Sequence, residues 1–399
     1  MKFLIRPRPY NTESLESYLL RVALANAYHS FREVAALAEK KHQLSNSEKA
    51  TTSSICRLPS VNFYLEKSPN ISRVEIFSTL ALLVGLDFQQ LSNLSFHKSN
   101  VIFCNDYKAV DYQGKAIPHC FIREKHIPIC TKCLRESVFI RQIWHFSPYK
   151  SCHIHQTPLL TNCPQCGQYI DYRLTESLTH CSCGFDLLTV KSNNIKQVNY
   201  PDFITQNEDT RNSGLIDQCS TSWKLAMLLW YFQRFESKPP INLAEISTDH
   251  LVLAEHYFKT WPQSLINELN EKLSQAEYLM IDVPSKIPFH KVFGCLIPHA
   301  VLMKGYEEKF EPVVDVVRNF LFQLIDNNPL KGSSNIADLL VSIDDIAIVF
   351  SASHKDVNEL LIKGEIKSSR RLKTKGIIEV YQPLFPLRSI RYLEFINDR

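Results

Sequence analysis

Cysteine and histidine pairs spaced for metal binding are the residues of this sequence with the clearest chemistry. A short C-x-x-C turn presents two thiolates to one metal ion, and a second pair completes a tetrahedron. Pairing in chain order predicts two sites, joined internally by loops of 18 and 14 residues. The half-sites are Cys130-x-x-Cys133 with Cys152-x-x-His155, and Cys163-x-x-Cys166 with Cys181-x-Cys183.

Both predicted sites are closed. A catalytic zinc keeps an open position beside three protein ligands, whereas each of these sites has four ligands. Zinc deaminases need a histidine followed two residues later by glutamate, and none of the 14 histidines has one. We therefore expect two structural Zn²⁺ ions per chain. Cys181-x-Cys183 is a tight spacing, which leaves His180 open as a substitute ligand, and His153 is expected to be a bystander.

Glycine spacing excludes several kinds of active site. The chain has 10 glycines, and no two lie within ten residues of each other. Walker A loops, dinucleotide-binding turns and G-x-S-x-G nucleophile elbows all need closely spaced glycines. The sequence also lacks an H-E-x-x-H motif, so we expect a protein that is not an enzyme. Its many carboxylates leave a metal-dependent nuclease open as an alternative, which a cleavage assay with magnesium would detect.

Composition is that of a globular protein with several domains. The 399 residues exceed one ordinary core, and 45% are hydrophobic. The net charge of +4 is low for binding nucleic acid by bulk electrostatics. The opening MKFLIRPRPYN is not typical of a signal peptide, and no apolar run could span a bilayer. We expect a cytoplasmic protein without membrane contact, in which cysteines bind metal rather than form disulfides.

Apolar periodicity predicts a mainly α fold with three domains. Residues 1–125 are expected to form a helical domain, residues 126–190 a tandem zinc-finger or ribbon segment, and residues 191–399 a C-terminal helical domain that opens with a polar linker. Further helices are predicted at Val74–Val84, Phe88–Leu94, Ser222–Phe235, Asp249–Trp261, Ser264–Leu279 and Pro312–Ile325. The aromatic residues expected in the core of the C-terminal domain are Trp223, Trp230, Tyr231 and Phe232.

The N-terminal domain begins with two predicted helices. The apolar positions of the first follow helical spacing, and Ser30 and Glu33 form a capping-box pattern that opens the second. A helix-turn-helix and an ordinary helical hairpin both fit this pattern. The apolar residues of the first helix are Leu15, Tyr18, Leu19, Val22 and Ala23.

The C-terminal domain ends in a more specific helix-turn-helix pattern, at about residues 340–376. Ser342 with Asp345 and Ser353 with Asp356 are at capping-box spacing, and Gly364 can end the second helix. A basic segment and a strand-like stretch, residues 376–382, follow as a possible wing. The basic residues predicted to contact nucleic-acid phosphates are Lys367, Arg370, Arg371, Lys373 and Lys375.

Three stretches of the sequence resemble the TniQ family of bacterial transposition proteins. RPRPYNTESLESYLLRVALANAY is similar to the opening motif of that family. IPICTKCLRES, IWHF and SCHIHQTPLLTNCPQCG resemble its zinc signature, and TWPQSL resembles a Trp-Pro helix start. Within the family, the length and N-terminal string look most like the members found in type I-F CRISPR-associated transposons.

The resemblance implies a homodimeric, non-catalytic adaptor. Such a protein links the RNA-guided Cascade complex to the AAA+ ATPase TnsC in RNA-guided DNA integration, and contacts target DNA mainly indirectly. The alternative is a TnsD-like protein that reads an attachment site in DNA itself. The absence of a longer C-terminal extension favours the Cascade adaptor as an expectation.

Overall fold

A computed structural model describes residues 2–45, 57–62, 71–191, 219–279, 283–306, 311–369 and 379–396. The chain forms two compact units and passes between them several times. The first unit consists of Met1–Asn100, Ala109–Asn207 and Leu243–Leu251. The second consists of Val101–Lys108, Glu208–Asn242 and Val252–Arg399. Most of the polar stretch predicted as a linker lies outside the described residues.

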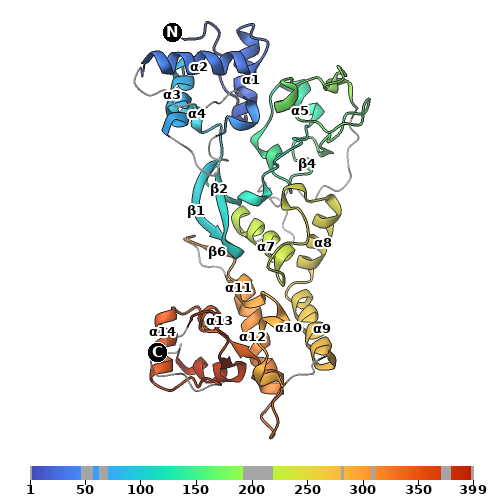
Figure 1. The fold of residues 1–399 in the computed structure, drawn as a ribbon. Coiled ribbons are helices and arrows are strands. Elements are labelled where there is room, and N and C mark those ends of the chain that lie inside the picture. The colour runs from blue at the N-terminus through green and yellow to red at the C-terminus, as the bar shows by residue number, and fades with distance from the viewer. Residues whose placement is uncertain are drawn as a thin grey trace. The chain divides into compact units, whose positions relative to one another are not determined.

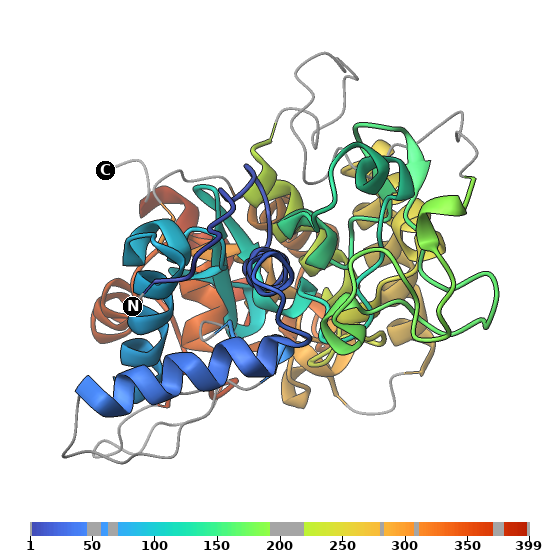
Figure 2. The same ribbon diagram turned by 90° about the horizontal axis from the view of Figure 1, so that it is seen from above.

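Four helices open the first unit. The Oγ of Ser14 accepts from the backbone N–H of Ser17 and so begins the first helix, whose apolar face is fully buried. Figure 1 shows the four helices gathered near the N-terminus, and Figure 2 shows the second running across the first. They are α1 (Leu15–Ala25), α2 (Phe31–Ser45), α3 (Ile71–Val84) and α4 (Phe88–Ser92).

The predicted helical domain also contains a β-hairpin that was not predicted from the sequence. Strand β2 (Tyr107–Tyr112) pairs with β3 (Lys115–Pro118), with Ala109 opposite Pro118 and Tyr112 opposite Lys115. The two-residue turn places Gln113 and Gly114 at positive φ, +54° and +77°, as the turns that fit twisted hairpins require. Ala109, Val110 and Tyr112 are buried, so packing rather than an Asn-Gly turn signal determines this hairpin.

Short elements carry the cysteine-rich part of the first unit. A 3-10 helix, Gln142–His145, and several loops connect them, and two of the elements pair as a short hairpin with Cys152 opposite Thr157. The elements are α5 (Thr131–Glu136), β4 (Ser151–Cys152), β5 (Thr157–Pro158) and α6 (Tyr172–Thr175).

Helices also dominate the second unit. Strand β1 (His97–Phe103) enters it at Val101 and pairs with β6 (Met303–Lys304), with Phe103 opposite Met303. α8 begins in the first unit and ends in the second. The helices are α7 (Thr221–Gln233), α8 (Thr248–Lys259), α9 (Gln263–Leu279), α10 (His290–Phe293), α11 (Leu296–Ala300), α12 (Pro312–Asn327), α13 (Ile343–Val349), α14 (His354–Ile362) and the 3-10 helix η12 (Leu387–Ile396); the remaining strands are β7 (Leu340–Val341) and β8 (Phe385–Pro386).

The core of the second unit contains the predicted aromatic residues. Trp223, Trp230 and Phe232 of α7 are buried, and Tyr231 is half-buried. The ring of Trp230 packs edge-on against Trp261 at 5.6 Å between centroids. Aromatic rings of this size contribute strongly to the stability of a core, and α7 supplies three buried ones to this unit.

α13 and α14 have the caps that the sequence predicts. The Oγ of Ser342 accepts from the N–H of Asp345, and the Oγ of Ser353 accepts from the N–H of Asp356. In both capping boxes the aspartate side chain also accepts a hydrogen bond from the backbone N–H of the serine. Beyond the helices, residues 376–378 of the predicted wing lie outside the described residues, and residues 379–382 are not in a strand.

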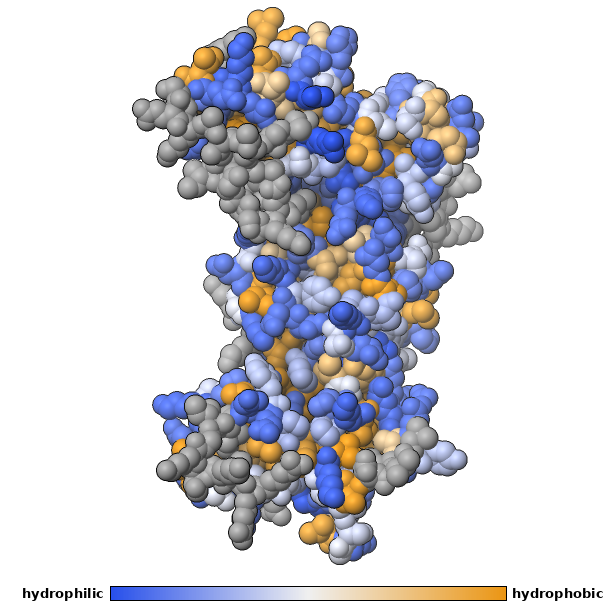
Figure 3. Space-filling view, viewed as in Figure 1, coloured by the Kyte–Doolittle hydropathy of each residue, from blue (hydrophilic) through white to orange (hydrophobic). Residues whose placement is uncertain are grey.

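The described surface mixes residue types. Figure 3 shows hydrophobic residues interspersed with hydrophilic ones on one face of each unit. None of the helices in the described part of the chain combines the length and apolar character that crossing a bilayer requires.

Candidate metal centres

The four side chains of the first predicted site meet around one point. His155 Nδ1 lies 3.5 Å from Cys130 Sγ, 3.2 Å from Cys133 Sγ and 3.6 Å from Cys152 Sγ. The sulfurs of Cys133 and Cys152 are 3.6 Å apart. A tetrahedral zinc with bonds of about 2.3 Å to sulfur and 2.0–2.1 Å to nitrogen needs ligand separations of roughly 3.5–3.8 Å. This first cluster therefore fits a tetrahedral metal ion.

Two local structures position the first cluster. Cys130 precedes α5 and Cys133 lies in its first turn, so the helix start presents both sulfurs together. Cys152 ends β4, and the following tight turn carries His155. The N–H of Gln156 donates to the Cys152 carbonyl at 2.7 Å and closes that turn, with Gln156 at a φ of +48°. Figure 1 shows α5 and β4 near one another in the first unit.

Burial makes several negative charges unfavourable in the first cluster unless a cation is bound. Cys130, Cys133 and Cys152 are each at most 3% exposed. Hydrogen bonds from the Cys133 and Cys152 thiols hold the pKa of Cys130 below its usual range, while the bonds to Cys130 raise the pKa of Cys133 and of Cys152. Only one thiolate is thus favoured without a cation, and a divalent ion would stabilise all three. The donor set fits a thiophilic metal.

The second cluster is built from two cysteine turns of a similar kind. Cys163 Sγ lies 3.7 Å from Cys183 Sγ, and Cys166 Sγ lies 3.7 Å from Cys181 Sγ. All four ligand atoms lie within 4.8 Å of one another, so they also could hold a metal ion. Each turn ends in a glycine at positive φ, +72° at Gly167 and +84° at Gly184. Their N–H groups donate to the carbonyls of Cys163 and Cys181.

Exposure separates the second cluster from the first. Cys163 is buried and Cys181 half-buried, but Cys166 and Cys183 are exposed. A hydrogen bond from the Cys183 backbone lowers the pKa of Cys181 to about 6, so this thiol supplies a thiolate at neutral pH. The second cluster therefore lies closer to solvent than the first.

The neighbouring histidines point to other partners. His180 Nδ1 pairs with Thr179 Oγ1 at 2.8 Å, and the structure brings Cys183 rather than His180 to the second cluster. His153 Nδ1 pairs with Tyr149 OH at 2.7 Å. This arrangement agrees with the expectation that His153 lies outside the first cluster.

The first unit also contains a buried polar network that was not predicted from the sequence. The Tyr172 hydroxyl lies 2.9 Å from Ser14 Oγ and 3.1 Å from His145 Nε2. Beside it, Arg173 and Asp171 form a buried ion pair at 2.7 Å. Burial, with Arg173 nearby, lowers the pKa of His145 to about 3, which keeps its ring neutral. The network joins α1 to the cysteine-rich segment.

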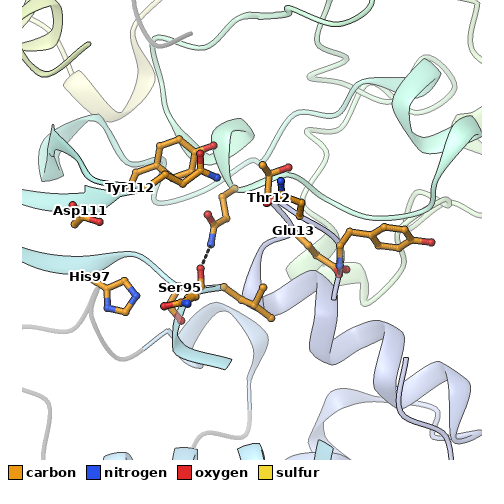
Figure 4. A pocket seen from close by; sticks show the side chains of 12 residues that line it. Thr12, Glu13, Ser95, His97, Asp111 and Tyr112 are labelled. Atoms are coloured by element: carbon orange, nitrogen blue, oxygen red, sulfur yellow. Dashed lines mark hydrogen bonds between the residues drawn. The ribbon is translucent and has the colours of Figure 1, made fainter. Parts of the chain in front are cut away.

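A pocket of about 430 Å³ is a third candidate site, also in the first unit. Figure 4 shows Thr12, Glu13, Ser95, His97, Asp111 and Tyr112 around it. Its most buried carboxylate is already occupied, because Glu13 accepts from Ser17, from Arg21 and from the N–H of Tyr10. Asp111 accepts from the N–H of Gly114. These bonds hold local structure and leave neither carboxylate arranged as a general base.

The predicted nucleic-acid contacts are mostly beyond what the structure describes. Lys367 is exposed after α14, whereas Arg370, Arg371, Lys373 and Lys375 lie outside the described residues. On α14 itself, His354 pairs with Asp344 at 2.7 Å. Lys355 and Glu359 are exposed on the same helix, so its outward face carries both signs of charge.

Part of the chain matches a known protein family. Residues 4–159 match the sequence model of the TniQ family, which is less than half of the chain. The match covers α1 to β5 and contains the complete first cluster, but it ends before Cys163. It supports a TniQ-type, transposition-associated protein. No curated protein matches the chain.

Proposed function

We propose that this protein is a non-catalytic adaptor in RNA-guided DNA transposition. It would link a Cascade complex to the ATPase TnsC and so select the target site. The observation that carries the proposal is the match of residues 4–159 to the TniQ family, together with a first cluster whose four ligands leave no open position. A closed site suits a structural role and supplies no Lewis acid to a substrate.

Each cluster is proposed to bind one structural Zn²⁺. Three thiolates with one imidazole, and four thiolates, are the ligand sets that structural zinc sites use. The segment around them consists of short elements, and bound metal would supply stability that so small a core lacks. Elemental analysis of protein purified under reducing conditions should find two zinc ions per chain, and fewer than about 1.5 would contradict the two-site proposal.

One experiment tests the adaptor function directly. Tagged protein is recovered from cells that carry or lack the genes of the CRISPR effector, and copurifying Cascade subunits and TnsC are identified by mass spectrometry. Recovery of Cascade only when the effector genes are present supports the proposal. Failure to recover Cascade from cells that express it would contradict it.

A TnsD-like target selector is the second candidate, and α13 and α14 are the observation that favours it. Two capped helices joined by a short turn are the core of many DNA-reading domains. The mixed charge of α14 instead favours weak, salt-sensitive contacts through Lys367, Arg370, Arg371, Lys373 and Lys375. A gel-shift assay distinguishes the two, because preference for one duplex by more than about a hundredfold would support the selector.

The adaptor is further proposed to act as a homodimer, as the family resemblance implies. Light scattering on the purified protein at micromolar concentration should give twice the chain mass of 46.1 kDa. A particle of single-chain mass would contradict this part of the proposal.

A further inference from the structure

Glu136 contacts the side of His155 that faces away from the cysteines. Its Oε1 lies 2.8 Å from His155 Nε2, while Nδ1 of the same ring faces the three sulfurs. A neutral imidazole that offers Nδ1 to a cation carries its proton on Nε2. In the metal-bound form, Nε2–H therefore donates to the Glu136 carboxylate.

The position of this carboxylate is unusual for its helix. Glu136 is the last residue of α5, where the partial negative charge of a helix end disfavours an anion. Its side chain is 64% exposed, so burial does not hold it there. Cys133 and Glu136 are three residues apart and share a helix face. The helix that supplies one ligand thus also places a carboxylate against another ligand.

We infer that Glu136 is a positioning residue for the first cluster. By accepting from Nε2–H it fixes the tautomer and orientation of His155, and it increases the electron density that Nδ1 offers to the metal. Hydrogen bonds of this kind typically change metal affinity by about 10–100-fold. The second cluster contains four cysteines and no imidazole, so it does not depend on Glu136. The inference rests on the proposed metal binding.

The test compares metal affinity in full-length wild type, E136A and E136Q. Each protein is loaded with Co²⁺, and the ion is removed by titration with a chelator while the visible spectrum is recorded. Tetrahedral sites with three sulfurs and one nitrogen absorb differently from sites with four sulfurs, so the two clusters are followed separately. E277Q, which changes an exposed glutamate of α9 in the second unit, is the matched control.

For E136A we expect a 10–100-fold loss of affinity at the first cluster, a changed spectrum of that cluster, and no change at the second. E136Q keeps an acceptor oxygen within reach but loses the charge, so its affinity should lie between wild type and E136A. Unchanged affinity and spectrum in E136A would overturn the inference and leave the zinc proposal intact. Wild-type protein that takes up no ion at the first cluster would overturn both.

Discussion

The two clusters of the first unit use nearly the same ligands but differ in what surrounds them. The sulfurs of the first are buried, and its histidine contacts a carboxylate. The second ends in exposed Cys166 and Cys183 and is held mainly by its own turns. Ligand type alone therefore does not determine how much a bound metal ion contributes to the stability of the surrounding fold.

Removing one ligand from each cluster should give the largest contrast. C133S should lose one zinc and destabilise the first unit by more than about 4 kcal/mol, because it leaves buried sulfurs without a cation. C166S should also lose one zinc but reduce stability clearly less, since Cys166 and Cys183 are exposed. Zinc content and denaturant unfolding measure both effects. C295S, at a cysteine outside the clusters, is the control. Equal losses of stability in C133S and C166S would contradict the expected difference between the two clusters.

Chelation should empty the clusters in order. A chelator can reach the exposed sulfurs of the second cluster directly, whereas the first must open before its ion is attacked. We expect the second cluster to lose zinc faster, by on the order of tenfold or more at neutral pH. Stopped-flow release into a coloured chelator, with C166S to identify the phase that disappears, checks the order. A single phase with two ions released together would contradict it.

Acid should destabilise the first unit through the buried side chain of His145. Its pKa is lowered to about 3 in the folded protein from the ordinary value of 6.5, so only the unfolded chain gains a proton as pH falls below 6.5. The free energy of unfolding therefore falls as the pH is lowered, and the fall is complete only near pH 3. The slope is at most about 1.4 kcal/mol per pH unit. Denaturation of wild type and H145Q between pH 7 and pH 5 measures it, because the slopes of the two proteins should differ.

The turns that end three of the half-sites offer the smallest effects. Gly167 has a φ of +72° and open space where a side chain would project, so G167A should cost roughly 1–2 kcal/mol of backbone strain. Gln156, the corresponding residue of the first cluster, already has this strained conformation, with a φ of +48°. Q156G should therefore stabilise the metal-bound protein by less than about 1 kcal/mol, since glycine also loosens the unfolded chain. Chemical denaturation with saturating zinc checks both signs.

The sequence predicted the eight residues that the structure brings into two clusters, because ligand spacing in short turns is a local property. The starts of α13 and α14 were predicted for the same reason, as the Ser342 and Ser353 capping boxes show, whereas Glu33 of the predicted Ser30 box accepts from the N–H of His29 instead. The β2–β3 hairpin was not, because its turn lacks the Asn-Gly signal and its strands are defined by burial. Long-range contacts were also missed. The pair of Ser14 with Tyr172 spans 158 residues and has no local pattern.

The position of Glu136 near a metal ligand could have been predicted from the sequence. It follows Cys133 by three residues, which on a helix places it beside the metal ligand. Only the structure shows that it contacts His155, a residue 19 positions further along the chain. The feature of the sequence that indicates this contact is a carboxylate three residues after a cysteine ligand.

α6 has a consequence for anyone who would produce part of this chain. The family match ends at residue 159, yet α6 begins at Tyr172 and its surroundings complete the interior of the matched segment. Tyr172 reaches Ser14 and His145, and Glu176 accepts from the N–H of Phe31 at the start of α2. A fragment cut at residue 159 would leave these polar groups and the space of a buried aromatic ring unfilled. A piece that keeps these contacts must extend beyond Glu176, and the first unit also includes Leu243–Leu251.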